Sequence, residues 1–462
     1  MPAKAGGAFH FLPAPAGLLV CHRPQPGVRK AKTAMTPSQP KLHIERMMHR
    51  NSLAVPGESA ASYALIKLIP SGAGAGPLGL NLALVVDVSG SMYEEDGTGI
   101  SRLDRVRKAA TAALGKLKPD DTLAIIAFAH NAQVVLPPTT IAERDRIEDV
   151  IERIDLFDVD PGGTSMDQGI ENGMSAVAAN VRPGTLSQVV VLTDGETSGE
   201  QRCRQLAQEA AQKKIRLALM GVGTEWNSSL IKDLARLAEG DWYYIDVNEA
   251  DAADRVFNKE FEHLASTGFT DVQMQIKPFK DVRIKRVRQV VPDIKDLPLG
   301  GGEGQPLVAK LGTLERDKAS RYILDLSLPR RPDGKYNLAQ VEVSYDLGNG
   351  RRESTSTLLE MTYTAAGHGY INAEVARHID EVQIFELNKN LQQAIASNNQ
   401  EQAKEVAQKI EKKGEVMGQR AAKKTMLAKQ VLQELNAGGR VSKKTQLAVD
   451  DVARMAEEMP TG

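Results

Sequence analysis

The sequence predicts an α/β protein in which a doubly wound, mostly parallel sheet is inserted in an antiparallel β-sandwich and followed by an α-helical region. Three observations predict this fold class. Apolar strands alternate with amphipathic helices between about Leu80 and Ser266, and the apolar period then changes to two between about Gly268 and Thr364. Helical stripes rich in Lys, Glu, Gln and Ala follow. The expected divisions are a disordered leader at 1–40, N-terminal strands of the sandwich at 41–76, the α/β domain at 77–267, the remaining sandwich at 268–365 and a helical region at 366–462.

The leader is rich in Pro, Ala, Gly and Lys, a composition typical of disorder. Its apolar stretch from Phe9 to Cys21 contains two prolines and no clean cleavage site, so we do not expect a secretory signal. Met35 is a second candidate start of translation. The next segments, LHIERMMHR and SYALIKLIPS, read as strands joined by a turn at Pro56-Gly57.

The α/β domain is predicted from continuous apolar runs, which are expected where parallel strands are buried on both faces. These runs are LNLALVVDV, TLAIIAFA, SQVVVLTD, IRLALMGVG and WYYIDV. The segments between them, such as LDRVRKAATAALGKL and GEQRCRQLAQEAAQKK, carry apolar residues at helical spacing. This alternation predicts a doubly wound open sheet.

The sandwich is predicted from strands that alternate apolar and polar residues, such as DVQMQIKPF, SRYILDLSLP and AQVEVSYDL. The two N-terminal strands have no partners nearby in the sequence. We therefore expect them to join this sandwich, which makes the α/β domain an insertion within it.

The last region is predicted to form three or four helices, with breaks at 397–399, at Gly414 and at 437–439. A bundle of helical hairpins is the favoured interpretation, and a coiled-coil-like docking surface is the alternative. Its clustered lysines are interleaved with Glu and favour solvated helix faces.

Composition excludes several classes of protein. The formal net charge is −1, the pI is about 6.7 and only 4% of residues are aromatic, so nucleic acid is not an expected partner. The two cysteines exclude a disulfide scaffold, and no apolar run is long enough to predict a membrane span. We expect a cytoplasmic location.

Oxygen-bearing side chains gather where the predicted strands end. VVDVSGSM places Asp87, Ser89 and Ser91 at the carboxyl edge of the sheet, where open α/β sheets bind ligands. The turn DPGGTSMDQG offers Thr164, and VVVLTDGE offers Asp194. Carboxylates and hydroxyls form an oxygen-only set that suits a hard cation. Two carboxylates are few for tight Ca²⁺ capture, so we expect Mg²⁺, with Mn²⁺ or Ca²⁺ as alternatives.

Two alternatives accompany this interpretation. In the first alternative, Asp87 and Ser89 bind no metal and only cap the following helix. The acidic run Glu94-Glu95-Asp96 would suit either a second cation site or an exposed loop, and the exposed loop is favoured.

These motifs resemble the metal-ion-dependent adhesion site of von Willebrand factor A (VWA) domains, whose pattern matches at all five metal-binding candidates. The resemblance implies that the two serines and, in the ligand-bound state, the threonine coordinate the metal directly. It also implies that the carboxylates often act through water and that a partner's Glu or Asp takes the open position. From about 42 to 364 the chain resembles bacterial VWA proteins related to inter-α-trypsin inhibitor heavy chains and calcium-activated chloride channel regulators.

We therefore expect a non-enzymatic module with an adaptor or assembly role, which binds an acidic side chain of a partner protein through Mg²⁺. One alternative is a Mg²⁺-dependent enzyme or chelatase-like subunit, although the sequence shows no GxSxG elbow and no P-loop. Another is an exported adhesin or channel regulator, against which the lack of a predicted signal and membrane span weighs. The sequence leaves the partner and the oligomeric state open.

Overall fold

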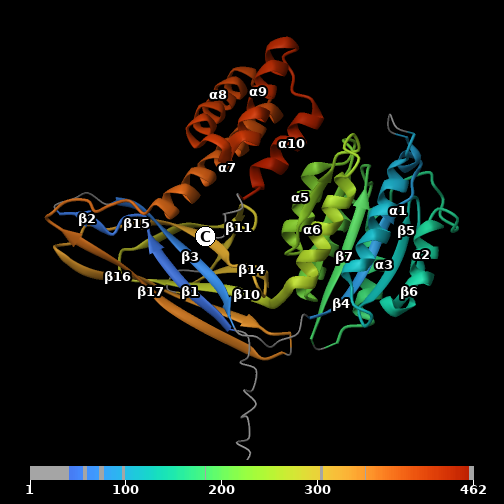
Figure 1. Cartoon of the computed structure of the whole chain (residues 1–462), viewed down its shortest axis with the longest axis horizontal. Coiled ribbons are helices and arrows are strands. Elements are labelled where there is room, and N and C mark those ends of the chain that lie inside the picture. Colours follow the sequence, from blue (N-terminus) through green and yellow to red (C-terminus); the bar gives the residue numbers. More distant parts are fainter. Residues whose placement is uncertain are drawn as a thin grey trace, which may run out of the picture.

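The computed structural model describes residues 41–55, 60–71, 78–95, 99–182, 184–301, 305–348 and 350–456. The expected leader at 1–40, the predicted turn at Pro56-Gly57 and Asp96 lie outside these residues. In Figure 1 the described chain forms three parts: the α/β domain at the right, the sandwich at the lower left and the C-terminal helices at the top.

The α/β domain is built on a six-stranded sheet with the order β6-β5-β4-β7-β8-β9. All pairs among β5, β4, β7, β8 and β9 are parallel, as the continuous apolar runs predict. Every residue of β5 and β8 is buried. The strands are β4 (Gly79–Asp87), β5 (Thr122–Phe128), β6 (Ala132–Thr140), β7 (Thr185–Thr193), β8 (Ile215–Val222) and β9 (Trp242–Ile245).

Helices cover both faces of this sheet because each turns an apolar stripe toward it. One apolar core contains side chains of α1, α2 and α6, and the other contains side chains of α3, α4 and α5. The helices are α1 (Arg102–Ala113), α2 (Arg144–Glu152), α3 (Met166–Ala178), α4 (Glu200–Gln212), α5 (Ser228–Leu237) and α6 (Ala252–Ser266). The fold is thus an α/β fold of the doubly wound type.

Two elements of this domain were not expected from the sequence. β6 pairs antiparallel with β5 at the edge of the sheet, which makes the sheet mixed. Its Pro137 and Pro138 obscured the strand pattern, yet an edge strand tolerates proline because one side of its backbone needs no partner. α6 follows β9 and leads into the sandwich.

The second part consists of two sheets packed face to face. One has five strands in the order β1-β3-β15-β11-β12, and the other has six in the order β13-β14-β10-β16-β17-β2. Side chains of both sheets share one apolar core, which includes Leu68 and Leu324 from the first sheet and Met274 and Val343 from the second. The later strands are β10 (Thr267–Pro278), β11 (Arg283–Val291), β12 (Lys295–Leu297), β13 (Leu299–Gly300), β14 (Leu307–Glu315), β15 (Ser320–Leu328), β16 (Gly334–Asp346) and β17 (Arg352–Thr364).

The strands that precede the α/β domain lie in these two sheets. β3 (Ala60–Ser71) pairs with β1 (Lys41–Met48) on one side and with β15 on the other. The short β2 (Ser52–Ala54) pairs in parallel with the end of β17. The chain therefore enters the sandwich, leaves it for the α/β domain and returns through β10.

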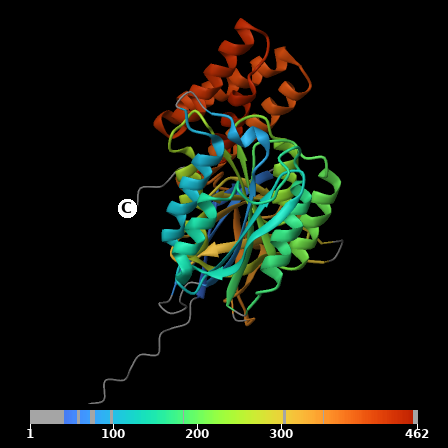
Figure 2. The ribbon, with the colours of Figure 1, turned by 90° about the vertical axis from the view of Figure 1, so that its right-hand side faces the viewer.

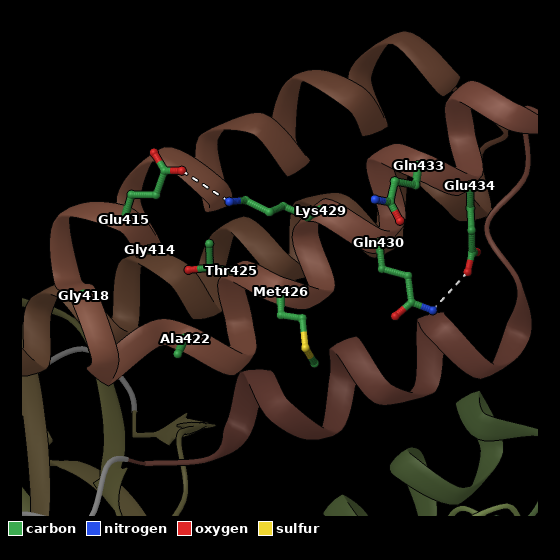
Figure 3. A pocket seen from close by; sticks show the side chains of 10 residues that line it. All are labelled: Gly414, Glu415, Gly418, Ala422, Thr425, Met426, Lys429, Gln430, Gln433 and Glu434. Carbon is green, nitrogen blue, oxygen red and sulfur yellow. Dashed lines mark hydrogen bonds and ion pairs between the residues drawn. The ribbon is translucent and has the colours of Figure 1, made fainter.

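Four α-helices of the described chain form the third part: α7 (Ala373–Ala396), α8 (Gln400–Met417), α9 (Ala422–Ala437) and α10 (Lys443–Arg454). The predicted break at Gly414 is wrong, because α8 continues to Met417. Figure 3 shows Gly414 facing Thr425 of α9, and a Cβ at Gly414 would lie only 2.1 Å from the Thr425 Oγ1 atom. Glycine at 414 thus permits close helix packing, and α8 ends instead at Met417, directly before Gly418, whose φ is +66°.

The helical part contacts both other parts. Val375, Ile379 and Val382 of α7 pack on the outer face of the five-stranded sheet against Ile323. Leu447 of α10 belongs to the apolar core of the α/β domain. Figure 2, which turns the molecule by 90°, shows these helices lying above the α/β domain.

A cleft of about 1350 Å³ lies where the three parts meet. Ion pairs join its walls: Lys295 of β12 lies 3.4 Å from Asp241, Lys389 of α7 lies 2.7 Å from Asp296, and Lys232 of α5 pairs with Asp450 of α10. The guanidinium of Arg454 stacks 3.7 Å from the centre of the Trp242 ring. No helix within the described ranges is long and apolar enough to cross a membrane.

Glu315, at the end of β14, joins the sandwich to α6. Its carboxylate lies 3.4 Å from His263 Nδ1 and 2.9 Å from Lys318 Nζ. Burial acts to raise the pKa of Glu315, but the hydrogen bonds and charges of His263 and Lys318 outweigh it and lower the pKa from 4.5 to about 2. The carboxylate is therefore stabilised in its charged form.

We expect Glu315→Gln to lower the free energy of unfolding at pH 7 by about 1–2 kcal/mol. Because the folded pKa lies below the unfolded value, this contribution is complete above pH 4.5 and is lost as the pH falls toward 2. Urea titrations at several pH values measure the difference between wild type and variant. Glu152→Gln, at an exposed carboxylate on α2, is the control. A difference that persists unchanged below pH 3 would contradict this account.

Candidate metal-binding site

The candidate site lies at the carboxyl edge of the central strands of the α/β sheet. Asp87 is the last residue of β4, and Asp194 directly follows β7, the neighbouring parallel strand. Both carboxylates belong to residues with 0% exposure. Since burying a charge is costly without compensation, two buried carboxylates at one edge imply nearby hydrogen-bond donors or cations.

The turn after β4 brings the first three candidates together. Asp87 Oδ1 accepts a hydrogen bond of 2.9 Å from the backbone N–H of Ser89, which closes the turn. The Ser89 and Ser91 hydroxyl oxygens then lie 3.2 Å apart. Ser91 Oγ donates to Asp194 Oδ1 at 2.7 Å, so the chain of contacts crosses from one strand end to the other.

The structure also tests the alternative that Asp87 and Ser89 only cap the following helix. Ser89 precedes a short 3₁₀ helix, η1 (Gly90–Tyr93), but its side chain makes no capping hydrogen bond there. The cap of α1 is Ser101, whose Oγ accepts from the backbone N–H of Asp104 at 3.0 Å. The Ser89 hydroxyl thus faces Ser91 instead of capping the helix.

Thr164 approaches from the third segment. The loop before α3 touches the first turn, because the backbone N–H of Gly90 donates to Pro161 O at 3.4 Å. Thr197 Oγ1 donates to Thr164 O at 2.9 Å, and a Cβ at Gly195 would lie 3.6 Å from Thr164 Oγ1. The backbone therefore places Thr164 beside the Asp194 strand exit, while the side-chain hydrogen bonds described above link the other four candidates.

Two residues that sequence reasoning missed complete the arrangement. Thr193 Oγ1 donates to Asp87 Oδ2 at 2.8 Å, so both oxygens of the buried carboxylate are held. Arg102, the first residue of α1, places Nη1 2.6 Å from Asp194 Oδ2 and Nη2 2.8 Å from Glu94 Oε2. Arg102 could have been identified in the sequence as a basic residue soon after the acidic run at 94–96, because two buried carboxylates require positive charge nearby.

The acidic run after the first turn is only partly described. Glu94 is 63% exposed at its side chain and pairs with Arg102, and Glu95 forms an isolated β-bridge with Ser101. These contacts are those of an exposed loop anchored to the start of α1.

The donor set fits a small divalent cation. Burial raises the pKa of Asp87 to about 6, although hydrogen bonds from Ser89 and Thr193 act in the opposite direction. A bound cation would compensate a carboxylate of this kind, and hydroxyl oxygens complete an all-oxygen set suited to Mg²⁺. No group of three or more His, Cys, Asp or Glu side chains in the described part of the chain is arranged to hold a metal.

The comparisons identify the class of domain. Residues 82–196 match the family model described as the von Willebrand factor type A domain. This segment spans Asp87, Ser89, Ser91, Thr164 and Asp194. The chain therefore contains a VWA domain, and such domains generally mediate protein interactions.

The similarity to individual relatives extends beyond the VWA domain. The chain is 32% identical over 274 residues to protein sll0103 of Synechocystis, a match that covers 58% of this chain and 62% of that protein. It is 23% identical over 293 residues to YfbK of Escherichia coli, covering 59% of this chain and 48% of that protein. The matched region thus spans less than two thirds of either curated relative. A solved VWA protein from Catenulispora acidiphila superposes with a TM-score of 0.74 over 90% of this chain and 97% of its own, and at 16% identity this superposition shows a shared fold alone.

Proposed function

We propose that this chain is a non-enzymatic protein-interaction module that binds an acidic side chain of a partner through Mg²⁺ held by Asp87, Ser89, Ser91, Thr164 and Asp194. The observation that carries the proposal is the run of contacts from Asp87 through Ser89 and Ser91 to Asp194, all at one sheet edge. This set offers only two carboxylates to a divalent ion. A further anionic ligand is therefore favourable, and a partner's Asp or Glu has that chemistry.

The surroundings of the site support binding more than catalysis. The side chains described around Asp87 and Asp194 are hydroxyls, an arginine and carboxylates, and the nearest hydroxyls are engaged with those carboxylates. Among the described contacts of Asp87 and Asp194, the hydroxyls meet only the carboxylates proposed to hold the metal, and no histidine or lysine is placed beside them as a general base. We propose an adaptor or assembly role for this module, and we propose the cytoplasm as its location.

Capture of a partner from native lysate tests this proposal. The full chain is immobilised with Mg²⁺, with EDTA, and as the Thr164→Ala and Thr164→Ser variants. We expect a protein that is retained with Mg²⁺, released by EDTA, lost with Thr164→Ala and kept with Thr164→Ser, because only the hydroxyl distinguishes the last two. We expect the loss of affinity with Thr164→Ala to be about 10–100-fold, the range found when groups that support a metal's ligands are mutated.

The same capture gives a clear negative result. A protein retained equally with EDTA and by Thr164→Ala would mean that another surface of the chain binds it. Cell fractionation of the tagged chain tests the proposed location, and recovery in the membrane or medium would contradict it.

A further inference from the structure

Arg102 connects the candidate metal site to the exposed acidic loop. Its Nη1 atom lies 2.6 Å from Asp194 Oδ2 and 3.4 Å from Ser91 O, while its Nη2 atom lies 2.8 Å from Glu94 Oε2. One guanidinium thus joins a fully buried carboxylate to one whose side chain is 63% exposed.

Local structure fixes this position. Ser101 caps α1, so Arg102 occupies the first helical position, and its backbone N–H donates to Glu94 O at 3.2 Å. Gly223, with a φ of +69°, lies beside the guanidinium, because a Cβ there would be 3.7 Å from Arg102 Cζ. The Arg102 side chain is 15% exposed and lies between the loop that carries Glu94 and the loop that carries Gly223.

The energetic consequence follows from the burial of Asp194. An ionised carboxylate with 0% exposure needs a positive partner, and Arg102 supplies one. A divalent ion at the same carboxylate would supply a second positive charge close to the first. The two cations repel each other, and each reduces the benefit of the other.

We propose that Arg102 competes with the divalent cation for Asp194, and that Glu94 receives the guanidinium when metal binds. This inference rests on the metal site proposed above. Glu94 already contacts the second nitrogen of the guanidinium, so the transfer needs only a small movement. Metal affinity is then set by this competition, and metal binding is coupled to the loop that carries Glu94.

Manganese titration of the full chain tests the inference, with bound Mn²⁺ measured by electron paramagnetic resonance. We expect Arg102→Gln to bind Mn²⁺ about tenfold more tightly than wild type, within the range of coupling energies found between contacting groups. Arg107→Gln removes the same charge from the same helix, where Arg107 pairs with Asp104 at 3.0 Å and with Asp155. We expect this control to bind within about twofold of wild type, because the Arg107 side chain is also 15% exposed but pairs with Asp104 and Asp155 and not with Asp194.

The proposed role of Glu94 is tested by substituting Glu94 itself. Its side chain is 63% exposed, so the substitution should leave the fold intact. Glu94→Gln should weaken Mn²⁺ binding in the wild-type background and have little effect in the Arg102→Gln background. Glu95→Gln removes the adjacent exposed charge and controls for general electrostatics. If Glu94→Gln has the same effect in both backgrounds, Glu94 does not receive the guanidinium and the coupling is overturned.

The remaining outcomes separate this inference from the proposed function. If wild type binds Mn²⁺ and Arg102→Gln binds it equally or more weakly, Arg102 positions Asp194 and the competition is refuted. If wild type and Arg102→Gln bind no Mn²⁺, or if Asp194→Asn binds it as well as wild type, the metal site itself is refuted. Thermal unfolding adds a second readout, since Mn²⁺ should raise the melting temperature more in Arg102→Gln than in wild type.

Discussion

Asp194→Asn is expected to weaken Mn²⁺ or Mg²⁺ binding by about 100-fold, at the upper end of the losses found when groups that support a metal's ligands are mutated. Asp194 is one of two buried carboxylates in the candidate set and accepts the hydrogen bond from Ser91. The amide keeps the size of the side chain but removes the negative charge, so both the electrostatic attraction and an oxygen donor are lost. Isothermal titration calorimetry with the full chain measures the change.

The matched control is Asp145→Asn, at an exposed position in the first turn of α2. It should bind metal as wild type does. Asp194→Asn also leaves Arg102 without its buried partner, so circular dichroism must first show that the variant is folded. A folded Asp194→Asn variant with unchanged affinity would exclude the site from metal binding.

Trp226→Ala should lower the free energy of unfolding by about 3–5 kcal/mol, the usual range for removing a buried large aromatic side chain. Trp226 is 1% exposed and packs with its ring centre 6.5 Å from those of Trp242 and Tyr244. Its Nε1–H also donates to Gly223 O at 2.8 Å. The substitution therefore creates a cavity and frees the loop that lies beside Arg102.

Urea denaturation followed by fluorescence measures this loss, because Trp242 is the single remaining tryptophan in the variant and reports on the same region. Trp226→Phe keeps an aromatic ring and loses the hydrogen bond, so its loss should be clearly smaller. A change below about 1 kcal/mol for Trp226→Ala would show that the core closes over the cavity.

The α/β sheet could be predicted from sequence because its pattern is local. Strands buried on both faces are largely apolar, and β4, β5, β7 and β8 each contain a continuous apolar run. The carboxyl ends of parallel strands fall on one edge of the sheet, so the sequence predicts that Asp87 and Asp194 lie at the same edge, and the structure shows that their strands are neighbours. The metal-binding role of the five residues stays a prediction.

The helical region shows where local patterns mislead. Glycine in a helix costs about 1 kcal/mol relative to alanine, which made Gly414 a plausible break. The contact with Thr425 reverses that interpretation, since α9 approaches α8 closely at a residue without a side chain. A glycine that ends a helix and one that admits a neighbour have the same appearance in sequence.

The sequence by itself determined the class of fold and the oxygen-bearing residues at the edge of the α/β sheet. Both are visible in short segments, because strands buried on both faces form apolar runs and the polar residues follow directly where these runs end. The tertiary structure alone decided which distant groups meet: the pairing of β3 with β15, the docking of Leu447 of α10 on the α/β core, and the contact of Arg102 with Asp194. Such contacts join residues far apart in the chain. They depend on how whole helices and strands pack and on which buried charges need a partner. Neither can be predicted from the local spacing of apolar residues.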